Sequence, residues 1–362
     1  MNVLSKRNVQ LVAAVMLCAA SAALASDKNR PTFTADGVVK VPAFELPPSS
    51  FMSKEAVEGM KYRAMMPPIE PFPNRPTIEE SRAVMEQQVA PLVQMMRAQY
   101  SVNILEQTIA GVKTRVFTPK DGKFDRERVL INLHGGAFQM CAEGCALLES
   151  IPITAKGGFK VISVDYRQGP EAVYPAATED VAAVYRELLK SYQPKQIGIY
   201  GCSAGGMLSG QVAAWLPAHQ LPQAGAIGMF GAGAARMGAG DSAYVTAYID
   251  GGFPPPVKGD ESMKWGSFRP YFQGVDMNDP MVLPAGHLDV LAKFPPTLVI
   301  TGSRAFDMSP AIYTNSQLLK AGVDSRLIVG EGLGHCYIYQ PQLPESQDAY
   351  ELIVRFFKKN LG

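Results

Sequence analysis

The sequence predicts an α/β protein with a mainly parallel central sheet, flanked by helices and covered by a helical cap. From about residue 102 onward, short apolar runs alternate with stretches of helical periodicity. Continuous apolar runs are typical of strands that are covered on both faces, because neither face then meets water. Alternation of strands and helices favours parallel pairing, and ligands then bind at the carboxyl ends of the strands.

The first 25 residues have the pattern of a secretory signal peptide. Lys6 and Arg7 precede an apolar run at 9–24, and the run ends in small residues. This order is typical of a segment that is removed on export, and we expect cleavage after Ala25. The alternative is a retained membrane anchor, but the run is short for a span. We therefore expect a periplasmic or secreted protein that has no stable membrane insertion after signal removal.

Residues 26–100 are expected to form an N-terminal arm and cap helices. The arm is rich in proline up to position 76. Thr77 and Glu80 then have the spacing of a capping box, in which each side chain accepts a hydrogen bond from the other residue's backbone. The box predicts a helix that runs toward Tyr100, with a kink at Pro91.

Residues 101–235 and 291–362 are expected to form the two parts of the α/β core. Within them, residues 181–189 place apolar side chains on one helical face. The predicted strands lie at 129–133, 161–164, 197–200, 298–300 and 327–329. Residues 236–290 interrupt this rhythm with glycines, three consecutive prolines and aromatic residues, and we expect a cap insertion there.

Charge and cysteine content exclude several function classes. The chain has 34 Lys and Arg and 33 Asp and Glu; removal of residues 1–25 takes away two bases and no acids, leaving 32 against 33. Such a balance, without a basic cluster, gives no reason to expect nucleic-acid binding. Four cysteines remain, which allow three complete pairings. Cys141 and Cys145 have ligand-like spacing, but no matching Cys or His pair follows, so no metal site is expected.

The segment IYGCSAGGM at 199–207 contains the pattern G-x-S-x-G, with Ser203 at its centre. It follows an apolar strand and precedes a predicted helix at 207–216. The glycines allow a sharp turn that exposes the serine hydroxyl. That hydroxyl needs a histidine to accept its proton and a carboxylate to orient the histidine. Without such partners, the segment is only a structural turn.

His335 is the best candidate for the base. It follows the predicted strand at 327–329 and comes after Ser203 in the chain, as the order Ser, Asp, His requires. The other histidines fit less well: His134 belongs to a glycine loop, His219 lies in a turn after a helix, and His287 lies in the expected cap. The glycine loop itself follows a strand, and its N–H groups either stabilise an oxyanion or form a plain turn.

Four motifs together give the chain a specific resemblance to the α/β-hydrolase fold and, within it, to bacterial esterases related to hormone-sensitive lipase. They are HGGAF at 134–138, DYRQGPE at 165–171, GCSAGG at 201–206 and GLGH at 332–335, and they occur in the family's order. The resemblance implies a serine hydrolase that forms an acyl-enzyme on Ser203, with His335 as base and then acid, and without a cofactor or metal. It also implies an oxyanion hole made by the N–H groups of Gly135, Gly136 and Ala204.

The acid of the triad departs from the family pattern. It often stands three residues after the glycine that ends the penultimate strand, where this sequence has Ala305. We assign the acid to Asp307, two residues further; the alternative role for Asp307 is a helix cap. Asp324 lies at the far edge of the sheet and Glu331 lies on the loop of His335 itself, so both are weaker candidates.

Two more departures lie beside the expected catalytic groups. Ala137 replaces the last glycine of the usual HGGG, which keeps the N–H but adds a methyl group. Cys202 replaces the acid that the family mostly places before the nucleophile; it is either a small buried thiol or a reactive one. Because Cys336 directly follows His335, we hypothesise that the two cysteines meet beneath the site and respond to oxidation. This requires Cα atoms within about 7 Å.

The sequence favours an exported serine esterase that acts on small or medium apolar esters. A cap rich in aromatic residues and methionine is typical of an apolar acyl or alcohol pocket. Two alternatives remain open, namely a peptidase or amidase with the same triad and a non-catalytic binding protein on the hydrolase fold. The expected partner is a small-molecule ester, and the sequence does not define an oligomeric state.

Overall fold

The computed structural model describes residues 30–63, 77–249 and 270–362, so the expected signal peptide and parts of the arm and cap lie outside the described residues. The chain divides into two compact units, Met1–Pro48 and Ser49–Gly362. In the first unit, β1 (Thr32–Phe33) and β2 (Val39–Lys40) form an exposed antiparallel pair. None of the described helices combines the length and apolar character needed to cross a membrane.

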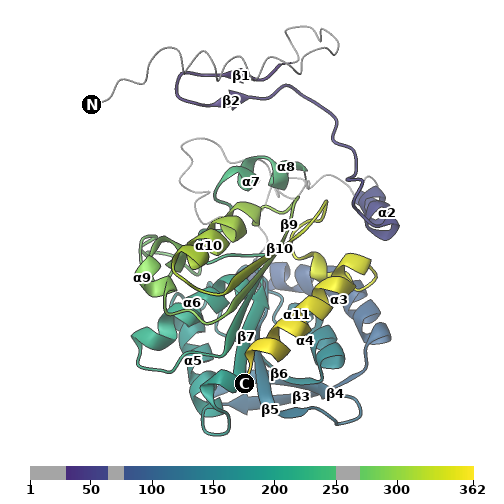
Figure 1. Ribbon diagram of the computed structural model, residues 1–362. Helices are drawn as coiled ribbons and strands as arrows, with labels where there is room; N and C mark the ends of the chain where they lie inside the picture. The colour runs from purple at the N-terminus through teal and green to yellow at the C-terminus, as the bar shows by residue number, and fades with distance from the viewer. Residues whose placement is uncertain (1–29, 64–76, 250–269) are drawn as a thin grey trace, which may run out of the picture. The chain divides into compact units, whose positions relative to one another are not determined.

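The second unit is built on a described sheet of eight strands in the order β10-β9-β8-β7-β5-β6-β4-β3 (Figure 1). Pairing is parallel from β10 through β6 and antiparallel where β4 joins β6 and β3. The strands are β3 (Val102–Ile109), β4 (Val112–Pro119), β5 (Asp125–Leu133), β6 (Phe159–Val164), β7 (Ile197–Cys202), β8 (Ala226–Phe230), β9 (Thr297–Gly302) and β10 (Ser325–Gly330). The predicted α/β fold with a mainly parallel sheet is confirmed, and all five predicted strands lie within these elements.

Helices cover both faces of the sheet, because side chains alternate between the faces along each strand. In β5, Val129, Ile131 and Leu133 pack in the core with α5, α6 and α10, whereas Leu130 packs in a second core with α3, α4 and α11. Figure 1 shows these two helix layers on opposite sides of the sheet. The helices are α3 (Ile78–Gln99), α4 (Gly144–Gly157), α5 (Ala176–Leu188), α6 (Ala204–Ala218), α10 (Met308–Lys320) and α11 (Pro344–Asn360).

The predicted capping box opens α3. The Thr77 side chain accepts from the Glu80 N–H at 3.2 Å, and the Glu80 carboxylate accepts from the Thr77 N–H at 2.8 Å. The helix continues through Pro91 to Gln99. The remaining described helices are α2 (Lys54–Arg63), α7 (Asp241–Tyr244), α8 (Thr246–Ile249), α9 (Leu288–Leu291) and the 3-10 turns η2 (Pro194–Gln196), η5 (Pro284–Gly286) and η6 (Tyr337–Tyr339).

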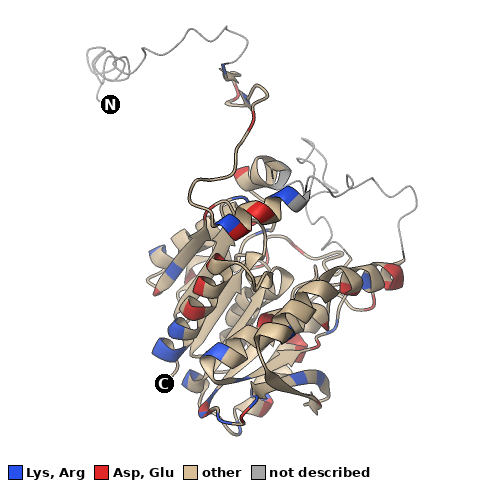
Figure 2. Cartoon of the chain, turned by 90° about the vertical axis from the view of Figure 1, so that its right-hand side faces the viewer, with Lys and Arg blue, Asp and Glu red and all other residues tan. Residues whose placement is uncertain are grey.

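Charged residues of both signs are mixed on the outer elements. Figure 2 shows Lys and Arg residues interspersed with Asp and Glu on the helices of this view. The mixture agrees with the near-neutral balance of 34 bases and 33 acids.

Candidate active site

Ser203 lies in a sharp turn between β7 and α6, with φ 58° and ψ −121°. A residue with a side chain adopts this conformation at a cost of about 1–3 kcal/mol, so the surrounding structure must hold it. A Cβ at Gly201 would lie 2.0 Å from the carbonyl oxygen of Leu133, and a Cβ at Gly205 would lie 1.7 Å from the same oxygen. The glycines of G-x-S-x-G are therefore required where the turn crosses the end of β5.

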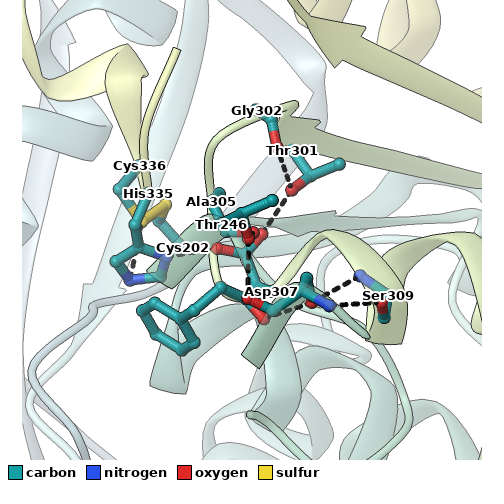
Figure 3. A network of polar contacts seen from close by, with 11 residues as sticks. Cys202, Thr246, Thr301, Gly302, Ala305, Asp307, Ser309, His335 and Cys336 are labelled. Carbon is teal, nitrogen blue, oxygen red and sulfur yellow. Dashed lines mark hydrogen bonds and ion pairs between the residues drawn. A yellow bond between two sulfur atoms is a disulfide. The ribbon is translucent and has the colours of Figure 1, made fainter. Parts of the chain in front are cut away.

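His335 is paired with Asp307. Its Nδ1 lies 2.5 Å from Oδ1 of the carboxylate, which is fully buried (Figure 3). The second carboxylate oxygen, Oδ2, accepts a hydrogen bond from Thr301 Oγ1 at 2.5 Å. Both oxygens are thus held in place, and the contact at Nδ1 leaves Nε2 as the ring nitrogen that can accept a proton.

The structure places Asp307, rather than either alternative acid, against the histidine. Asp307 occupies the N-cap position of α10, but its side chain makes no capping hydrogen bond. Asp324 stands before β10 and lies 3.9 Å from the Arg326 guanidinium, and Glu331 is exposed. The two-residue shift from the usual family position therefore still brings a carboxylate to His335.

The loop that carries Asp307 is tied to the described start of the expected cap. Thr246 Oγ1 lies 2.7 Å from the carbonyl oxygens of both Ala305 and Ser242, which share its one proton. Ser242 Oγ donates to the carbonyl oxygen of Phe306 at 2.7 Å. Figure 3 shows Thr246, Ala305 and Asp307 in one network. Helices α7 and α8 therefore support the acid from the cap side.

The other three histidines make contacts of a structural kind. His134 is fully buried, stacks on Tyr166 with ring centroids 4.3 Å apart, and places Nδ1 2.7 Å from the carbonyl oxygen of Gly135. Burial lowers its pKa to about 4, so it stays neutral. His219 and His287 each contact a backbone carbonyl oxygen, at 3.0 and 3.1 Å. Only His335 among the four meets a carboxylate.

A disulfide joins Cys202 to Cys336, with Cα atoms 6.3 Å apart. The hypothesis that these two cysteines meet beneath the site is confirmed, and the distance is within the limit of about 7 Å. Cys202 precedes Ser203 and Cys336 follows His335, so the expected nucleophile and base are each one residue from the same covalent link. Gly231 packs against it: a Cβ there would lie 2.6 Å from Cys336 Sγ and 3.2 Å from His335 Cε1.

Cys141 and Cys145 form a second disulfide, with Cα atoms 5.3 Å apart, at the start of α4. Their spacing of four residues, which resembles that of metal ligands, is used for a local cross-link. Across 30–63, 77–249 and 270–362, no three His, Cys, Asp or Glu side chains are grouped so that they could hold a metal ion.

The expected oxyanion donors differ in their contacts. Among the described residues, the N–H groups of Gly136 and Ala204 have no acceptor, and Ala204 is the first residue of α6, where no intrahelical partner exists. A Cβ at Gly136 would lie 1.9 Å from the carbonyl oxygen of Met140, which explains the glycine. Gly135 departs from the expectation, because its N–H donates to Glu149 Oε1 at 2.8 Å. One amide hydrogen cannot serve both partners, so Gly135 supports the loop instead.

The sequence reasoning missed Glu149, which lies on α4 and is 3% exposed. It contacts both the HGGAF loop and the turn before Ser203. A signal was present, since Glu149 is the only charged residue in the otherwise apolar and small run at 144–155. An acid in such a helix is buried and needs hydrogen-bond donors.

Comparison with known proteins agrees with this geometry. A family model described as alpha/beta hydrolase fold matches residues 130–339. Because this range is more than half of the chain, the protein belongs to the α/β-hydrolase fold family. The chain is 29% identical over 242 residues to an acetyl-hydrolase of Streptomyces hygroscopicus, an alignment that covers 65% of this chain and 77% of that protein.

Two further comparisons point the same way. The carboxylesterase/phospholipase LipF of Mycobacterium tuberculosis is 28% identical over 238 residues, covering 64% of this chain and 62% of that protein. The crystal structure of an esterase named E25 superposes with a TM-score of 0.77 at 28% identity, covering 89% of this chain and 99% of that one. The resemblance to bacterial esterases that the motifs indicate is confirmed.

Proposed function

We propose that the protein is an exported serine esterase that hydrolyses small or medium apolar carboxylic esters. The observation that carries the proposal is the contact of the buried Asp307 with His335, beside a disulfide that joins the neighbours of His335 and Ser203. A strained serine, a histidine and an orienting carboxylate are the parts that acyl transfer needs. The relatives described above are esterases and hydrolases, and this supports the same class.

In the proposed reaction, Ser203 Oγ bonds to the ester carbonyl carbon while its proton moves to His335 Nε2. The electron pair of the carbonyl double bond moves to oxygen, where the N–H groups of Gly136 and Ala204 stabilise the charge. Collapse breaks the bond to the alcohol, which takes the proton from His335 and leaves an acyl group on Ser203. Water then repeats the sequence and releases the acid.

The test is a panel of p-nitrophenyl esters of increasing acyl length, with Ser203→Ala as the control. We expect hydrolysis by the wild type and a loss of about 10⁴-fold or more in kcat for the variant. A fluorophosphonate probe should label the wild type on Ser203. Absence of both labelling and hydrolysis would favour a binding protein, whereas faster cleavage of matched anilides would favour an amidase or peptidase.

Export is part of the proposal. The pattern of residues 1–25 supports it, and so do the two disulfides, since disulfides persist mainly in oxidising compartments. Fractionation of cells that express the full chain should recover the protein outside the cytoplasm and beginning at Ser26. Recovery of uncleaved protein from the membrane fraction would favour the retained anchor.

A further inference from the structure

Glu149 brings its carboxylate to a point where four hydrogen-bond donors converge. Oε1 accepts from the Gly135 N–H at 2.8 Å and from the Tyr339 hydroxyl at 2.6 Å. Oε2 accepts from Asn132 Nδ2 at 2.8 Å and from the Cys202 N–H at 3.1 Å. The two oxygens of an ionised carboxylate offer about four acceptor positions, so the four donors use its full capacity.

These partners belong to different parts of the candidate site. Gly135 directly precedes Gly136, which carries an expected oxyanion donor. Cys202 directly precedes Ser203. Tyr339 lies in η6, just beyond the loop that carries His335. The buried Glu149 side chain on α4 therefore contacts the expected oxyanion loop, the turn of the expected nucleophile and the segment that follows the expected base.

The contacts favour the ionised form. The Gly135 and Cys202 N–H groups can only donate, and they lie on different oxygens of the carboxylate. The amide group of a glutamine would therefore point hydrogens at one of these backbone donors in either orientation. A proton on the carboxyl group could be accommodated only on Oε1, and only if the Tyr339 hydroxyl turned from donor to acceptor. The Asn132 amide is fixed as a donor too, because its oxygen accepts from the Ser163 hydroxyl at 2.7 Å.

We propose that Glu149 is a positioning residue for ester hydrolysis, and that its ionised carboxylate holds the oxyanion loop and the nucleophile turn in their working arrangement. The proposal rests on the proposed serine mechanism. Glu149 would not touch the substrate; it fixes Gly135 and Cys202, the neighbours of the groups that do. Its effect should fall on the transition state, since the oxyanion donors are used there rather than in the bound ester.

The surroundings make the charge sensitive to pH. Burial raises the pKa of Glu149 to about 7, although the hydrogen bonds from Tyr339, Asn132 and the two N–H groups lower it. The titratable groups that face it are tyrosines from three segments, Tyr166, Tyr200 and Tyr339, and burial and the Glu149 charge raise the pKa of each. They stay neutral, as does His134 in the adjoining loop.

The first test compares the pH dependence of kcat/KM in the wild type and in Glu149→Gln. In the wild type the Glu149 carboxyl must lose its proton before it can hold both segments, so Glu149 should contribute to the rise of log kcat/KM with pH on the acid side. In the variant this contribution is absent, and log kcat/KM should rise less steeply with pH than in the wild type. We also expect kcat at pH 8 to fall about 10-fold or more, with KM changed less than about 2-fold.

A second variant keeps the proposal testable if Glu149→Gln does not fold. Tyr339→Phe removes one hydrogen-bond donor and leaves the Glu149 carboxyl group in place. The pKa of Glu149 should then rise, so the acid limb, which is the part of the pH profile where kcat/KM rises with pH, should move to higher pH. Tyr185→Phe is the matched control, because that hydroxyl donates to the carbonyl oxygen of Pro222, outside the network. It should leave the acid limb unchanged.

Two results would overturn the role of Glu149. One is a Glu149→Gln variant with wild-type kcat and a rise of log kcat/KM with pH as steep as in the wild type, and the other is an unmoved acid limb in Tyr339→Phe. Ser203→Ala separates this from failure of the proposed function. Activity retained in Ser203→Ala would sink the serine mechanism itself. An inactive Ser203→Ala beside an unaffected Glu149→Gln would leave the mechanism standing and remove only the positioning role.

Discussion

Cys202 and Cys336 are 134 residues apart in the chain and are joined by a disulfide, so the residue before Ser203 is bonded to the residue after His335. The segments that carry the expected nucleophile and the expected base are therefore linked covalently as well as by packing. Here the sheet order places β8 and β9 between β7 and β10. The loop after β10 must therefore return over the ends of those strands to bring the Cα atom of Cys336 within 6.3 Å of that of Cys202.

Removal of this disulfide should destabilise the fold more than removal of the other one. Loop-closure entropy predicts a loss of about 5 kcal/mol for Cys202→Ala with Cys336→Ala, and of ~2 kcal/mol for Cys141→Ala with Cys145→Ala. Urea unfolding of the two double variants measures the free energies. Equal losses would show that strain or residual structure, rather than loop length, sets the contribution.

A free thiol at Cys336 should inhibit the enzyme more than loss of both sulfurs. Cys336 Sγ lies 3.6 Å from His335 Nε2. In Cys202→Ala the unpaired thiol carries a proton that it can donate to Nε2, in competition with Ser203. We expect lower kcat in Cys202→Ala than in the double variant that also carries Cys336→Ala. The opposite order, measured on monomeric protein, would count against this competition.

Asp307→Asn should reduce kcat by about 10³–10⁴-fold, because the amide can stabilise neither the correct tautomer of His335 nor its charged form. Glu331→Gln is the matched control, since Glu331 is exposed and lies on the histidine's own loop. It should change kcat less than about 2-fold. Steady-state hydrolysis of one p-nitrophenyl ester suffices, and a larger loss in Glu331→Gln would reassign the acid.

Gly205→Ala should prevent folding or lower the unfolding free energy by ~3 kcal/mol or more, because its Cβ would lie 1.7 Å from a backbone oxygen that cannot move aside. Gly286→Ala is the control, since a Cβ at Gly286 meets no described atom within 4 Å. It should stay within about 0.5 kcal/mol of the wild type. Thermal unfolding followed by circular dichroism would show the contrast.

Stability and activity should depend on pH in opposite directions through Glu149. Its folded-state pKa is about 7 against an ordinary 4.5, so the folded state binds the proton more tightly, and this contribution is lost as pH rises through 7. The folded-state pKa of His134 is lowered from 6.5 to about 4, so the folded state binds this proton less tightly than the unfolded state does. Its contribution to stability is lost as pH falls through 4. Between pH 4.5 and 6.5, Glu149 lowers the unfolding free energy as pH rises, whereas His134 raises it.

Glu149→Gln removes the contribution of Glu149, so the rise of the unfolding free energy with pH that His134 causes should become measurable. Its unfolding free energy, measured in urea, should gain on that of the wild type by up to ~3 kcal/mol between pH 4.5 and 7. Comparison of the two proteins cancels groups that the substitution does not affect. Parallel curves across this range would mean that Glu149 binds its proton equally in the folded and unfolded states.

The strands and the serine turn could be predicted because they depend on local pattern. The apolar runs predicted β5, β6, β7, β9 and β10. The order Ser, Asp, His along the chain indicated His335 and Asp307 as candidates. The pairing of the cysteines was not determined locally, since four cysteines allow three pairings. The contacts of Glu149 could not be predicted from the sequence either, because the packing of α4 against β5 determines which N–H groups the carboxylate contacts. The hydrogen bond from the Gly135 N–H to Glu149 could not be predicted for the same reason.

The hydrogen bonds from Ser242 and Thr246 to the loop of Asp307 set a limit for protein engineering. In this chain the first two helices of the expected cap carry hydroxyl groups that hold the backbone just before Asp307, the expected acid of the triad. A transplanted cap should therefore join the chain after Thr246, so that the host keeps both hydroxyls and only the substrate-facing part is exchanged.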